Sequence, residues 1–154
     1  MTRTVVIGLG NLLRGDDGAG IAVTRRVRAA APEGVDVVEL GDDLAGLPDA
    51  WSGMDLAVVV DAIRSDGPLG DVRWMELDPS RPLGGWRSPT SSHALGLASA
   101  VELGRTLGRL PGRLVLVGIE GAGAAAGDPL SPAVAEAVEA AAEQVLRAVE
   151  IPRR

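Results

Sequence analysis

Hydrophobic positions along the chain change their spacing several times, and each change marks a new strand or helix. Residues 4–7 form a β-branched, largely apolar run that stops at Gly8, as expected of a strand buried on both faces. Beyond Asp16 apolar side chains recur at helical spacing, with arginines between them, until Pro32 ends the segment. The chain therefore opens with a strand, a loop and a helix.

Four further segments have strand patterns. Residues 35–40 form one candidate, and residues 56–60 and 113–119 are apolar without alternation, which indicates strands buried inside a sheet. Residues 71–77 instead alternate apolar with polar side chains. That pattern predicts a half-exposed strand at an edge of the sheet.

Two more helices are predicted in the C-terminal half. One starts near His93, after a long loop rich in turn-forming residues. Its cap is expected among residues 90–92, and its buried stripe includes Leu97, Val101 and Leu107. The final helix opens at Ser131 and Pro132, and its apolar stripe consists of Val134, Val138, Ala141, Val145 and Val149.

Strands that alternate with helices predict a three-layer α/β/α sandwich around a mainly parallel, twisted sheet of about five strands. No repeat or linker interrupts the pattern, so we expect one domain over residues 1–154. A chain of this length buries roughly 70% of the surface that its unfolded form exposes. A core built from this chain alone is therefore expected.

Composition and charge add several points to this picture. The chain has no Phe or Tyr and only three Trp, so the core must be aliphatic. It also has no cysteine, which excludes disulfides and thiolate sites and favours a cytoplasmic protein. A formal net charge of −6 argues against a nucleic-acid partner, and no apolar run approaches the roughly 18 residues of a membrane span. We expect a monomer.

A glycine turn follows the first strand, and it resembles a dinucleotide-binding loop. Gly8 and Gly10 fit a GxGxxG pattern, and Glu39 would be the acid that binds the ribose. The third glycine is missing, because position 13 is Leu13. The acids at positions 16 and 17 would also repel a pyrophosphate. This interpretation is disfavoured but stays open.

The acids of that loop have two interpretations. Asp16 and Asp17 are suited to cap the helix that follows, since carboxylates stabilise helix starts. One acid would suffice for capping, however, and the pair is flanked by glycines at positions 15, 18 and 20, which leave room for a ligand. A binding site is therefore slightly favoured over a simple cap.

A metal site emerges when Asp17 is combined with two other residues. Asp61 directly follows a buried apolar run, and the carboxyl edge of an open α/β sheet is where ligands bind. His93, the only histidine, lies at a helix start that can face the same edge. Two carboxylates and one imidazole suit nickel or zinc, with positions left for a substrate. Asp61 as a turn acid and His93 as an ordinary surface or core residue are the alternatives.

Several other acids also follow strands. Asp42, Asp43 and Glu120 are second candidates, since any loop after a strand collects acids. The chain contains neither an HExxH sequence nor a GxSxG elbow. Common zinc-protease and serine-hydrolase designs are therefore excluded.

The chain resembles the nickel-iron hydrogenase maturation endopeptidases over nearly its whole length. The resemblance rests on blocks in matching order and spacing: GLGNLLRGDDGAG, VVVDAIRS, SSHALGLASAVELG, and the stretch from LVLVGIE to LSPAVAEAVEAAAEQVL. It implies a phosphorylase/hydrolase-like fold with a twisted sheet between helices. It also implies an endopeptidase that removes a short C-terminal extension from the nickel-iron hydrogenase large-subunit precursor after nickel insertion.

The resemblance assigns metal binding to Asp17, Asp61 and His93, the three residues that their positions had already selected. Nickel is then expected to arrive with the precursor, so that the free enzyme holds no permanent ion. A metal-polarised or carboxylate-activated water would attack the scissile carbonyl. Asp16 completes the expected catalytic set as a proton acceptor.

The chain departs from the family pattern at two places. Some members have Glu where this chain has Asp17, so the carboxylate here is one methylene shorter. Others have an Asp-Gly-Gly sequence where this chain reads Gly41-Asp42-Asp43. The role of that acid is therefore not transferred.

Two other function classes remain. A nickel-binding accessory protein without peptidase activity would use the same three ligands. A dinucleotide-binding oxidoreductase would use Gly8 and Gly10 instead. Cleavage of a nickel-loaded precursor separates the peptidase from the first alternative, and retention on a nucleotide resin would favour the second.

Overall fold

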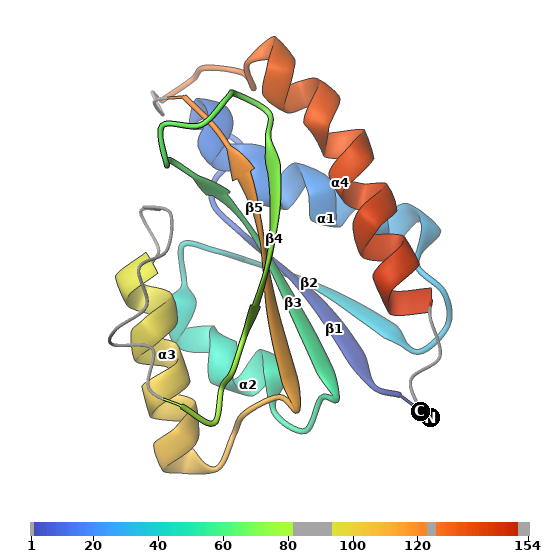
Figure 1. The fold of residues 1–154 in the computed structure, drawn as a ribbon, viewed down its shortest axis with the longest axis vertical. Coiled ribbons are helices and arrows are strands. Elements are labelled where there is room, and N and C mark those ends of the chain that lie inside the picture. Colours follow the sequence, from blue (N-terminus) through green and yellow to red (C-terminus); the bar gives the residue numbers. More distant parts are fainter. Residues whose placement is uncertain (1, 82–93, 123–125, 151–154) are drawn as a thin grey trace.

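A computed structural model describes residues 2–81, 94–122 and 126–150, and it has the three predicted layers (Figure 1). The central sheet has five strands in the order β2-β1-β3-β5-β4. The strands are β1 (Thr4–Leu9), β2 (Val35–Gly41), β3 (Leu56–Ile63), β4 (Val72–Leu77) and β5 (Arg113–Glu120). Neighbouring strands are parallel except β4, which pairs with β5 antiparallel at one edge. The mainly parallel sheet and the edge strand are therefore confirmed.

Helices cover both faces of the sheet (Figure 1). One face carries α1 (Ala19–Ala30) and α4 (Pro132–Glu150), and the other carries α2 (Leu47–Trp51) and α3 (Ala94–Leu107). Two short 3-10 helices, η1 (Gly15–Gly18) and η2 (Leu44–Gly46), precede α1 and α2. Among the helices of the described segments, none is both long and apolar enough to cross a membrane.

Alternation along β3 divides the core between the two faces. Val58 and Val60 pack under α1 and α4, whereas Ala57 and Val59 pack under α2 and α3. Both clusters are built from aliphatic side chains, with Trp51 as the large exception. The indole N–H of Trp51 donates to the backbone oxygen of Arg109 at 2.9 Å, so its polar group is satisfied. An aliphatic core is therefore confirmed.

The structure differs from the sequence expectations in three places. Helices η2 and α2 were not predicted, because segments of three and five residues are too short to show a helical period. Strand β3 runs to Ile63, so Asp61 lies inside the strand rather than after it. The prediction that Leu107 is buried was wrong: it is the last residue of α3 and is 51% exposed, whereas Leu97 and Val101 are buried as predicted.

Helix α1 begins in direct contact with the carboxyl ends of two strands. A Cβ at Gly20 would lie 2.4 Å from the backbone oxygen of Val60 and 2.5 Å from that of Leu9. Only glycine permits this approach, since both neighbours are backbone atoms. The packing fixes the loop between β1 and α1 at the carboxyl edge of the sheet.

Candidate active site

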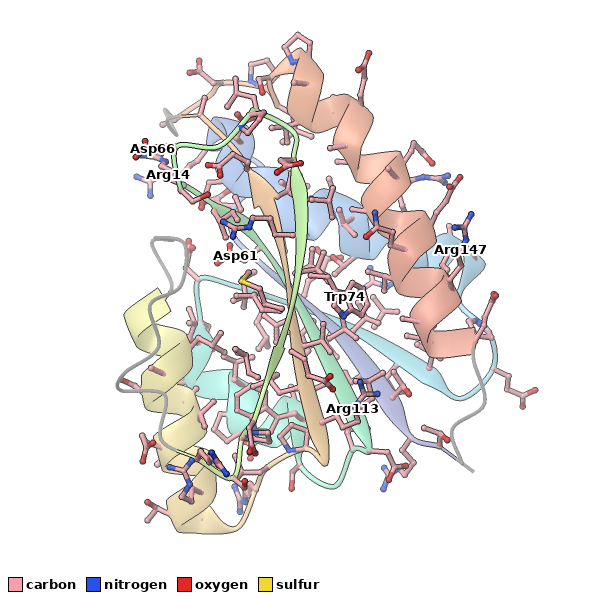
Figure 2. All side chains as sticks on the ribbon, viewed as in Figure 1. Arg14, Asp61, Asp66, Trp74, Arg113 and Arg147 are labelled. Carbon is pink, nitrogen blue, oxygen red and sulfur yellow. The ribbon has the colours of Figure 1, made fainter. Side chains whose placement is uncertain are left out.

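Asp61, like Asp16, is a deeply buried residue of the predicted site. It is 2% exposed, and in the register of β3 and β5 it lies opposite Gly118. Because it follows the alternation of Ala57 and Val59, its side chain belongs to the face covered by α2 and α3. One carboxylate oxygen accepts a hydrogen bond of 2.9 Å from the N–H of Ala62. Figure 2 shows Asp61 towards the carboxyl end of the sheet.

His93 lies outside the described residues. Helix α3 begins at the next residue, Ala94, and it runs from the carboxyl end of the parallel strands towards their amino end (Figure 1). The first turn of α3 and the carboxylate of Asp61 are therefore on the same face and at the same end of the sheet. The role of His93 stays a prediction.

Asp17 is carried by a tight crossing of two backbone segments. It lies in η1 and is partly exposed, and its backbone oxygen accepts a hydrogen bond of 3.0 Å from the N–H of Asn11. Gly10 has a φ of +105°, and a Cβ there would lie 1.9 Å from the same oxygen of Asp17. Glycine is required at position 10 for both reasons. The end of β1 and the turn with Asp17 are thus held in contact.

Asp16 is 2% exposed, and hydrogen bonds occupy both of its carboxylate oxygens. One oxygen accepts from the N–H of Ser131 at 2.7 Å. The other accepts from the Ser131 hydroxyl at 2.9 Å and from the N–H of Ala122 at 2.8 Å. Asp16 therefore binds the start of α4, and α1 has no side-chain cap bond. Its predicted role as proton acceptor stays a prediction.

Glu120 ends β5 and is also 2% exposed. Its carboxylate accepts from the N–H of Ser65 at 2.8 Å, from the Ser65 hydroxyl, and from the N–H of Gly67 at 3.3 Å. Burial favours the protonated form, but these bonds and the charge of Arg73 outweigh it and hold the pKa of Glu120 below its usual value. Glu120 thereby holds the loop between β3 and β4.

An open cleft of about 590 Å³ lies at the same edge, between the loops that follow β1 and β2. Its lining is partly apolar, and Leu13 on its rim is 73% exposed. The carboxylate of Glu39 forms salt bridges with the guanidinium groups of Arg25, at 3.1 Å, and Arg28, at 2.7 Å. Despite partial burial, the hydrogen bond from Arg25, with that from Arg28, holds the pKa of Glu39 below its usual value. Glu39 is thus engaged by two cations, which disfavours its proposed role as a ribose acid.

The acids after β2 are exposed. Asp42 lines the cleft, and the N–H of Asp43 donates to the backbone oxygen of Leu40 at 3.0 Å. Within residues 2–81, 94–122 and 126–150, no three His, Cys, Asp or Glu side chains are grouped so that they could hold a metal ion. In that part of the chain no further acid completes a three-ligand group with Asp17 and Asp61. The predicted site depends on His93.

Sequence reasoning missed the partners that hold these acids. Ser65 was not singled out, and Ser131 was predicted only as the start of the last helix, although each donates through both its hydroxyl and its backbone N–H. The only available signal was the Ser-Pro pair before α4, which marks a helix start. That signal does not reveal which carboxylate lies beside it.

Comparison with known proteins gives consistent matches over nearly the whole chain. A family model described as hydrogenase maturation protease matches residues 21–148. The hydrogenase 2 maturation protease of Escherichia coli (strain K12) is 29% identical over 149 residues, which cover 96% of this chain and 90% of that protein.

Solved structures agree with the family match. The hydrogenase maturating endopeptidase HybD from E. coli aligns with a TM-score of 0.82 and 27% identity, covering 96% of this chain and 92% of that one. The NiFe hydrogenase maturation protease HybD from Thermococcus kodakarensis gives a TM-score of 0.78 and 28% identity, with coverages of 97% and 100%.

Proposed function

The chain belongs to the hydrogenase maturation protease family, and from that premise we propose that it removes the C-terminal extension of a nickel-iron hydrogenase large-subunit precursor after nickel insertion. An endopeptidase role in hydrogenase maturation follows from the family itself. The precursor as partner, the timing after nickel insertion and action as a cytoplasmic monomer are parts of the proposal.

The observation that supports the proposal best is the buried carboxylate of Asp61 at the carboxyl edge of the sheet. A carboxylate that is 2% exposed loses most of its hydration, so a cation that reaches it is bound strongly. Asp17 is carried at the same edge, and α3 begins there directly after His93. Two carboxylates and one imidazole are a suitable donor set for nickel.

Nickel in this scheme is part of the substrate. Asp17, Asp61 and His93 bind the metal that the precursor carries, and this contact holds the scissile peptide in place. Holding the peptide in place raises the cleavage rate greatly, because orienting two reactants replaces a bimolecular encounter by an intramolecular one. Water then adds to the peptide carbonyl carbon, the C–N bond breaks, and the new amine takes up a proton. The cleft beside Gly10 and Leu13 offers space for an extended peptide.

The experiment is mass spectrometry of the large-subunit precursor, with and without nickel, after incubation with the enzyme. We expect the wild type to shorten only the nickel-loaded precursor. Asp61→Ala and His93→Ala should each lower the cleavage rate at least about 100-fold, because each removes one of three contacts that position the substrate. Asp49→Ala is the matched control, since this exposed acid pairs with Arg109 beyond the far end of α3.

Each part of the proposal has its own contrary result. Cleavage of nickel-free precursor at the wild-type rate would reject nickel recognition. Normal cleavage by both the Asp61 and His93 variants would reject the site. An intact nickel-loaded precursor after incubation with wild type would reject the peptidase function on this substrate.

A further inference from the structure

Helix η1 and the residues just before it are fastened to the loop before α4 by several hydrogen bonds. Asp16 accepts three of them, from Ala122 and from both donors of Ser131. Two hydrogen bonds between backbone groups add to these. The N–H of Gly15 donates to the backbone oxygen of Asp128 at 2.9 Å, and the N–H of Gly127 donates to the backbone oxygen of Leu13 at 2.6 Å. More than 100 residues separate the two sides, so the contact is purely tertiary.

The same contact extends to the strand that carries Asp61. The N–H of Gly121 donates to the backbone oxygen of Ile63 at 3.0 Å, and the next N–H, of Ala122, donates to Asp16 at 2.8 Å. Ile63 lies two residues beyond Asp61 in β3. A Cβ at Gly121 would lie 2.8 Å from the Cβ of Asp16, so glycine is needed for this approach. Consecutive N–H groups thus join the end of β3 to Asp16.

We infer that Asp16 is a positioning residue, which sets the place of Asp17 relative to Asp61 by fastening the turn of η1 to Gly121, Ala122 and Ser131. The inference rests on the proposed function, in which Asp17 and Asp61 bind the same substrate. Asp17 is the next residue after Asp16, so a displacement of Asp16 moves it directly. The side chain of Asp16 reaches no substrate in this role.

Two features support positioning over direct proton transfer. Both oxygens of Asp16 are already occupied by donors, and the carboxylate is 2% exposed. A buried carboxylate that accepts bonds through both oxygens is suited to hold backbone segments in one geometry. Reactive groups must be held to within about 0.5 Å of their productive positions, and this requires such supporting contacts.

Three variants test the inference by steady-state cleavage of nickel-loaded precursor. Asp16→Asn keeps the shape but removes one acceptor oxygen, so at least one N–H, of Ala122 or Ser131, loses its partner. Ser131→Ala removes only the hydroxyl bond, and Ser131→Thr keeps it. We expect kcat to fall about 100-fold for Asp16→Asn and about tenfold for Ser131→Ala. Ser131→Thr should remain within about threefold of wild type, and KM should change little in all three.

Trp51→Phe is the control for loss of stability. It removes the hydrogen bond to Arg109 from a fully buried side chain, at the end of the molecule away from the site. Its Tm should fall, but its kcat should equal that of wild type at a temperature where circular dichroism shows both proteins folded. If Asp16→Asn does not fold, Ser131→Ala and Ser131→Thr carry the comparison.

Amide NMR shifts give a second measurement that does not depend on cleavage. Asp16→Asn should change the N–H resonances of Ile63 and Ala62, because the contact passes through Gly121 to the end of β3. Changes confined to Ala122 and Ser131 would overturn the inference. So would wild-type kcat in Ser131→Ala, because the hydroxyl bond would then contribute nothing to the placement of Asp17. A wild type that leaves the precursor intact rejects the proposed function, whereas equal cleavage by wild type and Ser131→Ala rejects only the positioning role.

Discussion

Replacing Glu120 removes the acceptor that holds the loop between β3 and β4. Glu120→Ala leaves the N–H groups of Ser65 and Gly67 and the Ser65 hydroxyl without this carboxylate. Asp66, between the two donors, has a φ of +61°, a left-handed conformation that non-glycine residues rarely adopt. The loop therefore needs external contacts to keep its shape.

The loss of stability can be worked out from these bonds. A hydrogen bond to a charged group contributes about 1.5–3 kcal/mol, and a buried donor left without a partner costs about 1–3 kcal/mol. Ser65 and Gly67 are only partly buried, so water replaces some of the lost contacts. We expect Glu120→Ala to lower the free energy of unfolding by about 2–4 kcal/mol. For a domain of this size, that corresponds to a fall in Tm of about 5–15 °C.

Glu120→Gln should lose less stability than Glu120→Ala, because the glutamine amide still has one acceptor oxygen. The pKa of Glu120 is lowered in the folded protein, so its ionised form stabilises the fold. This contribution is complete above the ordinary pKa near 4.5, and it is lost as the pH falls through the lower folded-state value. The stability difference between wild type and Glu120→Gln should therefore be constant near pH 7 and shrink below about pH 4.5.

Urea unfolding followed by circular dichroism at pH 7 and at pH 4 measures both effects. Glu143→Ala on the exposed face of α4 is the control, and its stability should stay within about 0.5 kcal/mol of wild type. A loss below about 1 kcal/mol for Glu120→Ala would refute the energetic reasoning. If the stability difference between wild type and Glu120→Gln does not depend on pH, the argument that ionised Glu120 stabilises the fold is refuted.

Two further predictions concern the frame around the site. Gly20→Ala should destabilise the protein by about 1–3 kcal/mol in urea unfolding, because the new Cβ would lie 2.4 Å from the backbone oxygen of Val60. The control is Ala29→Ser on the exposed side of α1, which should have little effect. Arg25→Ala should raise the pKa of Glu39 towards its ordinary value in a carbon-detected NMR titration, since Arg25 is the main cause of the lowered pKa; an unchanged value would assign the effect to Arg28 alone.

Long periodic segments account for most of what the sequence could predict. The stripe of α4 and the apolar runs of β3 and β5 are long enough for their spacing to identify both the element and its buried face. Helix α2 has five residues and was missed, and the exposure of Leu107 depends on where α3 ends relative to its neighbours. Short elements and element ends depend on tertiary contacts, which periodicity does not contain.

The candidate site was predictable as a location but not as a set of contacts. A carboxylate that ends an apolar run reaches the carboxyl edge of a parallel sheet, and this general rule found Asp61. The partner of Asp16 was not predictable, because Ser131 is 115 positions away and serines are common at helix starts. Capping the next helix was a reasonable local expectation for Asp16, yet its carboxylate binds the start of α4 instead.

Asp16 and Glu120 hold loops together at this edge, whereas Asp17 lies more exposed on the turn of η1. Asp16 and Glu120 each accept three hydrogen bonds from other loops, and both are almost inaccessible. Asp17 is the more exposed, and it lies on a turn that Gly10 and Asp16 hold on either side. In the proposed function, the precursor would meet Asp17 while Asp16 and Glu120 keep the loops fixed. We expect such a site to select its substrate by fit to a preformed geometry, because moving Asp17 would require breaking the bonds of Asp16 first.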